Sequence, residues 1–244
     1  GRVLGRWPSQ GINSVWSEAA YLAAIESDLV EPDNSPCEIG CDVARYGDDD
    51  TAMHVRRGSV SLHHESHNGW STVQTAGRLK QLAAEYGARC GIDGRRVQVK
   101  IDDDGVGGGV VDQADGYRFD PVNAGTKAVE EDGYPNRRSE LWFVTAELAR
   151  HRRLSFARLA ASDQRELRRQ CMAPTWQVDN QGRRVVEPKD RTKKRLGRSP
   201  DDMDAVNLAY AYVPPAAAAS ADSGSIRDTY GADRRSLTRL GGRR

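Results

Sequence analysis

Aspartates gather at three separate places in this chain of 244 residues, and each group lies where a strand or a helix is expected to begin or end. The groups contain Asp42 in GCDVARYGDDDT, Asp102 in KIDDDGVGGG and Asp204 in SPDDMDAVNLAY. Carboxylates that folding brings together repel one another unless a cation lies between them, and hard divalent cations prefer oxygen ligands. The spacing therefore predicts a centre for divalent cations, of the kind that a metal-dependent phosphodiesterase uses.

Asp42 lies on a segment, residues 38–44, that alternates with the period of a strand. It shares one face of that strand with Gly40 and Ala44, whose small side chains leave space for ions and a sugar-phosphate chain beside the carboxylate. A turn is predicted for the three aspartates that follow, Asp48, Asp49 and Asp50.

Asp102 ends the strand before the glycine-rich segment GVGGG. It continues the face of Gln98 and Lys100, whereas Asp103 points to the other face and Asp104 begins a turn, so Asp102 is the predicted ligand. The glycines lack the spacing GxGxxG, and three aspartates before them would repel a pyrophosphate, which argues against a dinucleotide site. A GxxxxGK[ST] loop is also absent from the sequence, which excludes an ATPase of that type.

Ser199 and Pro200 predict the start of the helix that carries the third group, with Ser199 as the N-cap and Pro200 in the first turn. Asp202 stands three residues after Ser199 and is interpreted as part of a capping box. Asp201 lies in the first turn, where the helix dipole favours negative charge, and is predicted to be an additional metal ligand.

Asp204 lies beyond the cap positions, on the stripe that Leu208 and Tyr212 continue. Since that stripe faces the core, an inward carboxylate there needs a cation as its partner, and Asp204 is predicted to be a catalytic metal ligand. Auxiliary ligands are left open among Asp48, Asp50, Asp103 and Asp201.

The elements that must position these carboxylates predict one α/β domain. Short alternating runs predict a meander of three antiparallel strands, a helix followed by a strand predicts a βαβ crossover, and two runs around DNQG predict an added β-hairpin. The predicted strands are 39–43, 52–56, 60–64, 97–102, 119–123, 175–178 and 183–187, and the predicted helices are 17–27, 71–86, 136–151, 162–170 and 200–212.

Composition divides the chain into three parts. Residues 1–36 are predicted to be a lead-in, 37–213 the globular domain, and 214–244 a disordered basic tail that could tether a partner, because it has few large apolar side chains. The chain starts without Met, which suggests a piece of a longer protein.

Bulk properties indicate a soluble protein of a reducing cytoplasm. Apolar residues make up 38% and charged residues 29%, without a run long enough to span a membrane and without an apolar leader. The net charge is only +1, but basic and acidic residues occupy separate runs, which predicts a dipolar surface. Neither a disulfide framework nor a zinc site is predicted for the scattered Cys37, Cys41, Cys90 and Cys171. Positions on a strand surface, without a metal, are predicted for His63, His64 and His67.

Four segments taken in order resemble the C-terminal nuclease domain of the large terminase subunit of tailed bacteriophages. They are GCDVARYGDDDT, IDDDGVGGGVVD, YPNRRSELW and VVEPKDRTKKRLGRSPDDMDAVNLAYA, and the resemblance covers about residues 37–213. The lead-in WPSQGINSVWSEAAYLAAI is similar to the segment that joins the family's ATPase half to its nuclease. This resemblance implies a ribonuclease H-like fold, with a mixed β-sheet flanked by helices.

The resemblance also implies a function. Asp42, Asp102 and Asp204 match the family's catalytic carboxylates, which hold two Mg²⁺ or Mn²⁺ ions, with Asp42 between them. The implied activity is cleavage of concatemeric double-stranded viral DNA during packaging, leaving 5′-phosphate and 3′-hydroxyl ends. The implied partners are the terminase small subunit and the portal of the procapsid, in the host cytoplasm.

Basic residues near the hairpin are predicted to hold DNA phosphates. They are Lys189, Arg137, Lys193 and Lys194. Two other functions stay open: a junction resolvase or integrase-like nuclease of the same fold, and a non-catalytic module that docks on DNA or a portal.

Overall fold

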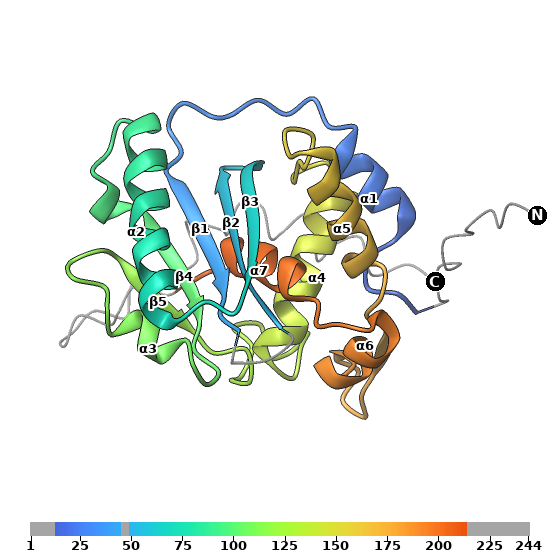
Figure 1. The fold of residues 1–244 in the computed structure, drawn as a ribbon. Coiled ribbons are helices and arrows are strands. Elements are labelled where there is room, and N and C mark those ends of the chain that lie inside the picture. The colour runs from blue at the N-terminus through green and yellow to red at the C-terminus, as the bar shows by residue number, and fades with distance from the viewer. Residues whose placement is uncertain (1–12, 45–48, 214–244) are drawn as a thin grey trace, which may run out of the picture. The chain divides into compact units, whose positions relative to one another are not determined.

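The computed structural model describes residues 13–44 and 49–213. Five strands form one mixed sheet in the order β3-β2-β1-β4-β5 (Figure 1). β1 pairs antiparallel with β2, and β2 with β3, while β4 is parallel to β1 and β5 is parallel to β4. The strands are β1 (Cys37–Asp42), β2 (Asp50–Arg57), β3 (Val60–Asn68), β4 (Gln98–Asp102) and β5 (Phe119–Val122).

The register of β1 and β4 places their aspartates at one edge of the sheet. Cys41 is opposite Ile101, and the next residue of each parallel strand is Asp42 or Asp102. Because parallel strands end at the same edge, these two carboxylates leave the sheet side by side. The predicted meander and the crossover into the second aspartate group are therefore confirmed.

One face of the sheet is covered by α2 (Thr72–Arg89), which Ser71 and Gln74 cap with a reciprocal capping box. The helix buries Leu79, Leu82 and other apolar residues against the strands. A short 3-10 turn, η1 (Gly94–Arg96), leads from it into β4, and α3 (Gly108–Val111) follows β4.

The other face is covered by α7 (Asp201–Ala209), which α4 (Arg137–Arg150) joins from the side (Figure 1). The helix approaches β1 so closely that a Cβ added to Gly40 would lie 2.2 Å from the carbonyl oxygen of Ala205 and 2.3 Å from the amide nitrogen of Ala209. The prediction that Gly40 leaves room for ions is therefore wrong: its missing side chain admits the helix that carries the third aspartate group.

A second apolar core lies among the helices on this side. It contains residues of α1 (Glu18–Ile25), α4, α5 (Ala161–Cys171) and α7. Trp16 and Tyr21 of the lead-in are buried in it, so the boundary predicted near residue 36 separates elements that share one core. The predicted tail, 214–244, lies outside the described residues.

The predicted hairpin is confirmed as a separate sheet of two strands, β6 (Trp176–Val178) and β7 (Arg184–Val186). Gly182 in its turn has φ 81°, a conformation that glycine adopts without strain. The chain then enters α6 (Lys189–Leu196), which ends at Gly197 in the left-handed region. The hairpin is thus followed by a strongly basic helix, which begins beside the edge of the sheet where the aspartates lie.

Two of the four cysteines are bonded to each other. Cys37 and Cys90 form a disulfide between the start of β1 and the end of α2, whereas their spacing had predicted none. Sequence separation hides this pair, because the α2 crossover returns the chain to the amino end of β1. Within the described residues, none of the helices has the length and apolar character to cross a membrane.

Candidate metal centre

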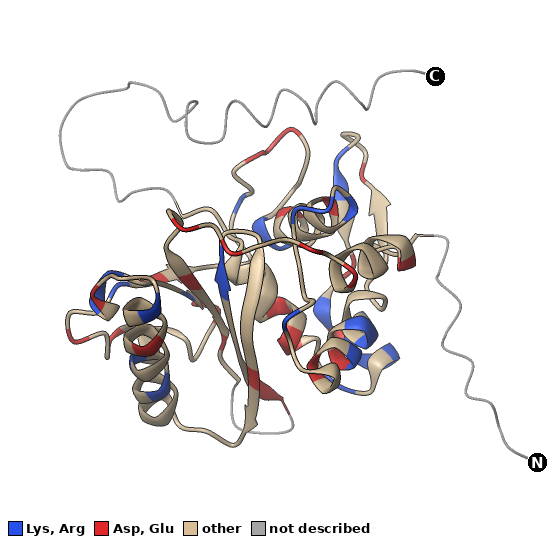
Figure 2. Ribbon diagram, turned by 90° about the horizontal axis from the view of Figure 1, so that it is seen from above, with Lys and Arg blue, Asp and Glu red and all other residues tan. Residues whose placement is uncertain are grey.

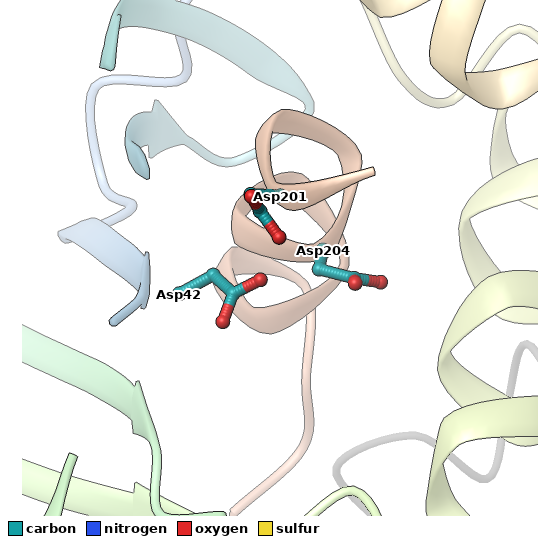
Figure 3. Close-up of side chains that lie close together, drawn as sticks. All are labelled: Asp42, Asp201 and Asp204. Carbon is teal, nitrogen blue, oxygen red and sulfur yellow. The ribbon is translucent and has the colours of Figure 1, made fainter. Parts of the chain in front are cut away.

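Three carboxylates meet where β1 ends and α7 begins. One oxygen from each of Asp42, Asp201 and Asp204 lies within 4.8 Å of the other two (Figure 3). Asp201 and Asp204 stand three residues apart and so share one face of α7, which points them toward the end of β1. The structure therefore brings together Asp42 and Asp204, and places Asp201, predicted as an additional ligand, at the same point.

Each helix carboxylate is oriented by a hydrogen bond from outside the cluster. The backbone amide of Asp50 donates to Oδ2 of Asp201 at 3.1 Å, and the indole Nε1 of Trp142 donates to Oδ1 of Asp204 at 3.0 Å. The other oxygen of each side chain faces the ammonium of Lys189. These bonds hold the two carboxylates in place before any ligand arrives.

Lys189, the first residue of α6, supplies the cation of the cluster. Its Nζ lies 2.9 Å from Asp42 Oδ2, 3.1 Å from Asp201 Oδ1 and 2.9 Å from Asp204 Oδ2. Burial alone would lower the pKa of Lys189, but the carboxylates of Asp204, Asp42 and Asp201 outweigh it and hold this pKa well above the usual lysine range. The ammonium is therefore charged and occupies a position where a metal ion would satisfy the same oxygens.

Asp102 lies beside the cluster, on the wall of the same cavity, and its Oδ1 accepts a hydrogen bond from the amide of Asp104 at 3.2 Å. Burial raises the pKa of Asp102 to about 6, and Asp204 adds to this effect. Burial likewise raises the pKa of Asp42 well above the usual range, with Asp201 and Asp204 as further causes. Burial is the main cause of both shifts, and the neighbouring carboxylates add to it.

The carboxylates open into a cavity of about 340 Å³. Its wall combines acidic residues at the end of the sheet with side chains from α4 and α7. The residues that line it include Asp42, Asp49, Asp102, Asp104, Asp201, Asp204, Lys189, Arg138, Leu141, Trp142, Asn207 and Leu208.

The basic residues predicted to bind DNA have different surroundings. Arg137 is 6% exposed and forms an ion pair of 2.6 Å with Glu140, so its burial argues against a phosphate contact. Lys193 pairs with Asp49 at 2.6 Å, and Lys194 is exposed on α6. Lys189 faces the carboxylates.

Many charged residues from separate runs of the sequence lie next to residues of opposite charge. Lys and Arg stand beside Asp and Glu over much of the ribbon (Figure 2). Many of these neighbours are ion pairs, such as Arg78 with Glu65 and Arg195 with Glu187. Ion pairs therefore involve many of these charges, and the runs in the sequence do not show which charges are paired.

The interpretation of Asp202 as a helix cap is wrong. α7 starts after Pro200 without a side-chain cap, and the hydroxyl of Ser199 is buried instead. Asp202 Oδ1 accepts a hydrogen bond from Nε2 of His64 at 2.9 Å, and its other oxygen accepts one from Gln170. Gln170 in turn accepts from the amide of Met203 at 3.1 Å, so residues of β3 and α5 hold the first turn of α7.

A buried chain of side chains continues from His64. Its Nδ1 lies 3.3 Å from Nδ1 of His54, whose Nε2 lies 2.9 Å from the hydroxyl of Ser61. Burial holds the pKa of His54 well below the usual range, so this imidazole is neutral. With Asp202 as the acceptor at one end, hydrogen bonds run from Ser61 through both rings to the carboxylate. The prediction of a surface position is therefore wrong for His64, which is 8% exposed.

The aspartates left open as auxiliary metal ligands differ in their surroundings. Asp48 lies outside the described residues. The carboxylate of Asp50 forms an ion pair with Arg198 and accepts a hydrogen bond from Asn68, while its backbone amide donates one to Asp201. Asp103 lies next to the glycine turn, with its Oδ1 3.1 Å from where a Cβ of Gly108 would be. Of the three candidates that the structure describes, Asp201 is the one whose carboxylate lies in the cluster.

Sequence reasoning missed three residues of the cavity wall: Arg138, Trp142 and Asn207. A usable signal was the helical spacing of Arg138 and Trp142, which puts both on one face of α4. For Asn207 the signal was its position three residues after Asp204, on the face of α7 that carries the carboxylates.

Comparison by sequence finds neither a matching family model nor a matching curated protein. Comparison by structure finds large terminase nucleases of phages. The nuclease domain of the large terminase subunit gp2 of bacterial virus Sf6 has a TM-score of 0.66 and 17% identity, over 83% of this chain and 100% of that one. The large terminase nuclease of thermophilic phage G20c with bound magnesium has a TM-score of 0.56 and 18% identity, over 82% and 97%.

A third match, the large terminase nuclease domain of Thermus phage P74-26, has a TM-score of 0.54 and 18% identity, over 81% of this chain and 94% of that one. At such identities the likeness is one of fold. The chain has the ribonuclease H-like fold of large terminase nuclease domains, a mixed sheet flanked by helices with an added hairpin, which confirms the predicted fold class.

Proposed function

We propose that the chain is the nuclease part of a phage DNA-packaging terminase, a metal-dependent endonuclease that cuts concatemeric double-stranded DNA. The observation that carries this proposal is that the carboxylates of Asp42 from β1 and of Asp201 and Asp204 from α7 meet at one point, around the ammonium of Lys189. The fold shared with phage terminase nucleases supports the class of reaction and of substrate.

The residues of the centre fit Mg²⁺ or Mn²⁺. Their donors are carboxylate oxygens, which these hard ions prefer, and three carboxylates there face a single ammonium. In our proposal Asp42, Asp201 and Asp204 hold one ion, and Asp102 shares a second with Asp42. When bound, the pair supplies an activated water and stabilises the leaving 3′ oxygen, which leaves 5′-phosphate and 3′-hydroxyl ends.

The protein's own contribution is to keep these ligands in position and to make way for the ions. Trp142 and the amide of Asp50 restrain Asp204 and Asp201, so little ordering remains to be done when an ion binds. Lys189 is 36% exposed and has a flexible stem, so its ammonium can move from the carboxylates toward a DNA phosphate. Lys193 and Lys194 on α6 extend the positive charge along the proposed DNA path.

The proposal includes partners that act through the rest of a terminase. These are an ATPase half that the lead-in, residues 1–36, would join to the nuclease, the small subunit, and the portal of the procapsid in the host cytoplasm. The structural neighbours are nuclease domains of large terminase subunits, which supports this setting. The tail, 214–244, is proposed as a tether to such a partner.

Plasmid cleavage tests the proposal. The protein should nick or linearise supercoiled DNA with Mn²⁺ or Mg²⁺ and be inactive with a chelator. Asp42→Asn, Asp102→Asn and Asp204→Asn should each abolish cleavage while the circular dichroism spectrum stays native, and Asp132→Asn, at an exposed aspartate outside the cavity wall, should cleave normally. Cleavage by all three carboxylate variants would refute the assignment.

The two other functions have their own signatures. A junction resolvase or integrase-like nuclease would cut a four-way junction faster than a linear duplex of the same sequence. A non-catalytic docking module would bind no Mn²⁺ in a calorimetric titration, or bind it equally well after Asp42→Asn.

A further inference from the structure

The cavity beside the carboxylates has a second wall that the metal ligands do not form. Arg138 and Trp142 stand four residues apart on α4, and Asn207 stands one turn after Asp204 on α7. All three line the cavity that contains Asp42 and Lys189. A molecule in contact with the carboxylates would therefore also meet these side chains.

Two of these side chains contain buried N–H groups without an acceptor in the described part of the chain. They are Nε and Nη2 of Arg138 and Nδ2 of Asn207. Buried donors in folded proteins are nearly always satisfied, and an unsatisfied one costs about 1–3 kcal/mol. Two helices that both leave donors unsatisfied in the wall of one cavity indicate a missing oxygen ligand.

The remaining contacts hold both groups in defined orientations. Nη1 of Arg138 donates to the carbonyl oxygen of Glu187 at 2.6 Å, and its guanidinium lies 5.9 Å from the ring centroid of Trp142. The hydroxyl of Thr145 donates to Oδ1 of Asn207 at 2.6 Å. In this orientation of the amide, Nδ2 is the atom that lacks a partner.

Charge selects the kind of ligand. Asn207 is 2% exposed and neutral, whereas Arg138 is a permanent cation that forms no ion pair with any described carboxylate. Among the described residues of the cavity wall, the other cationic side chain is that of Lys189, whose ammonium already contacts three aspartates. A fork of guanidinium N–H donors beside an amide N–H suits a phosphate group.

We propose that Arg138 and Asn207 form a phosphate subsite that binds the non-bridging oxygens of the DNA phosphate at the metal centre. This inference rests on the proposed nuclease function and adds to it the residues that hold the substrate. The subsite would keep the phosphate against the carboxylate cluster, whose charge would otherwise repel it. Inorganic phosphate has the same chemistry, so the experiment separates it from DNA.

Three variants and one control test the subsite. Arg138→Gln removes the cation, Arg138→Lys keeps charge without the fork, and Asn207→Leu removes the amide at similar volume, while Thr145 can still donate to the carbonyl oxygens of Leu141 and Trp142. Arg96→Gln is the matched control, because it removes an exposed arginine at the amino end of β4, opposite the edge that carries Asp102.

Cleavage of a labelled duplex with Mn²⁺, Mn²⁺ affinity by calorimetry and duplex binding by fluorescence anisotropy in EDTA are measured for each protein. Arg138→Gln and Asn207→Leu should lower kcat/KM roughly tenfold to a hundredfold with unchanged Mn²⁺ affinity, and Arg138→Lys should recover only part of this loss. Arg138→Gln should also weaken duplex binding and reduce its salt dependence. Arg96→Gln should match the wild type.

Several results would overturn the inference. Variants that cleave like the wild type would mean that the donors are hydrated and bind no substrate. An equal loss of Mn²⁺ affinity would assign both residues to the metal centre instead. Inhibition by millimolar inorganic phosphate that disappears in Arg138→Gln, with unchanged duplex affinity, would assign the site to free phosphate. A wild-type protein that neither binds Mn²⁺ nor cleaves would refute the proposed function itself.

Discussion

Replacing Lys189 by methionine removes the cation of the cluster and keeps a side chain of similar length. Its ammonium contacts the carboxylates of Asp42, Asp201 and Asp204 at 2.9 to 3.1 Å. Breaking a buried ion pair costs about 3–5 kcal/mol, and because Lys189 is 36% exposed, solvent screening reduces this to about 2–3 kcal/mol. We expect Lys189→Met to lose that much free energy of unfolding in EDTA.

Divalent ions should reverse the loss. A bound ion replaces the charge of the ammonium, and at a free concentration of about 100 times Kd it stabilises the fold by about 2.7 kcal/mol. Since no ammonium has to be displaced, Lys189→Met should bind Mn²⁺ about tenfold more tightly or better. Its activity should nevertheless fall if Lys189 meets a DNA phosphate after the ion binds.

Urea unfolding with EDTA or Mg²⁺, together with Mn²⁺ calorimetry, measures both effects. Lys194→Met is the control, because Lys194 is exposed on the same helix and should change neither quantity. A Lys189→Met protein that is as stable as the wild type in EDTA and binds Mn²⁺ no more tightly would contradict this role of the ammonium. Lys189 would then be a substrate contact alone.

Two other changes test the packing and the charge of the site. Gly40→Ala puts a Cβ 2.2 Å from the carbonyl oxygen of Ala205, so α7 must shift. We expect a loss of about 1–3 kcal/mol in urea unfolding together with weaker Mn²⁺ binding. The control is Gly77→Ala, at a helical glycine whose added Cβ would meet nothing outside the adjacent backbone of its own helix within 4 Å, and it should lose neither. Asp102→Asn tests the pKa of about 6. Between about pH 4 and 6, without metal, folded Asp102 keeps a proton that the unfolded chain has lost. The stability contributed by protonated Asp102 therefore disappears as pH rises through this range. Between pH 4 and 7 the stability of Asp102→Asn relative to the wild type should increase by about 2–3 kcal/mol in EDTA, and a difference that does not change with pH would contradict the shift.

Local patterns in the sequence were sufficient for the sheet and for two of the carboxylates. Alternation defines β1 and β4, and parity selects Asp42 and Asp102 at their ends, because both depend on a few consecutive residues. The face of α7 that carries Asp204 follows in the same way from helical periodicity.

Long-range partners could not be predicted in this way. Ser199 and Asp202 match a capping box, but the partners of Asp202 come from β3 and α5, and no local pattern indicates them. The orientations of Arg137 and Arg138, at the start of α4, could not be predicted from the sequence either. Asn136 caps that helix, which turns Arg137 toward Glu140 and Arg138 toward the cavity. Successive helical residues point about 100° apart, so the choice between them depends on where the helix starts.

The order of the elements along the chain has a consequence for synthesis. Asp42 belongs to the first strand of the sheet, whereas Asp201 and Asp204 belong to the last described helix, which packs on that strand only after the intervening elements exist. Domains fold as the chain leaves the ribosome, and contacts between distant segments form late. An unfinished or truncated copy that lacks α7 would therefore have Asp42 and Asp102 but neither Asp201 nor Asp204, and no complete centre. Under the proposed function, translation itself would keep incomplete copies from cutting the DNA of the cell that makes them.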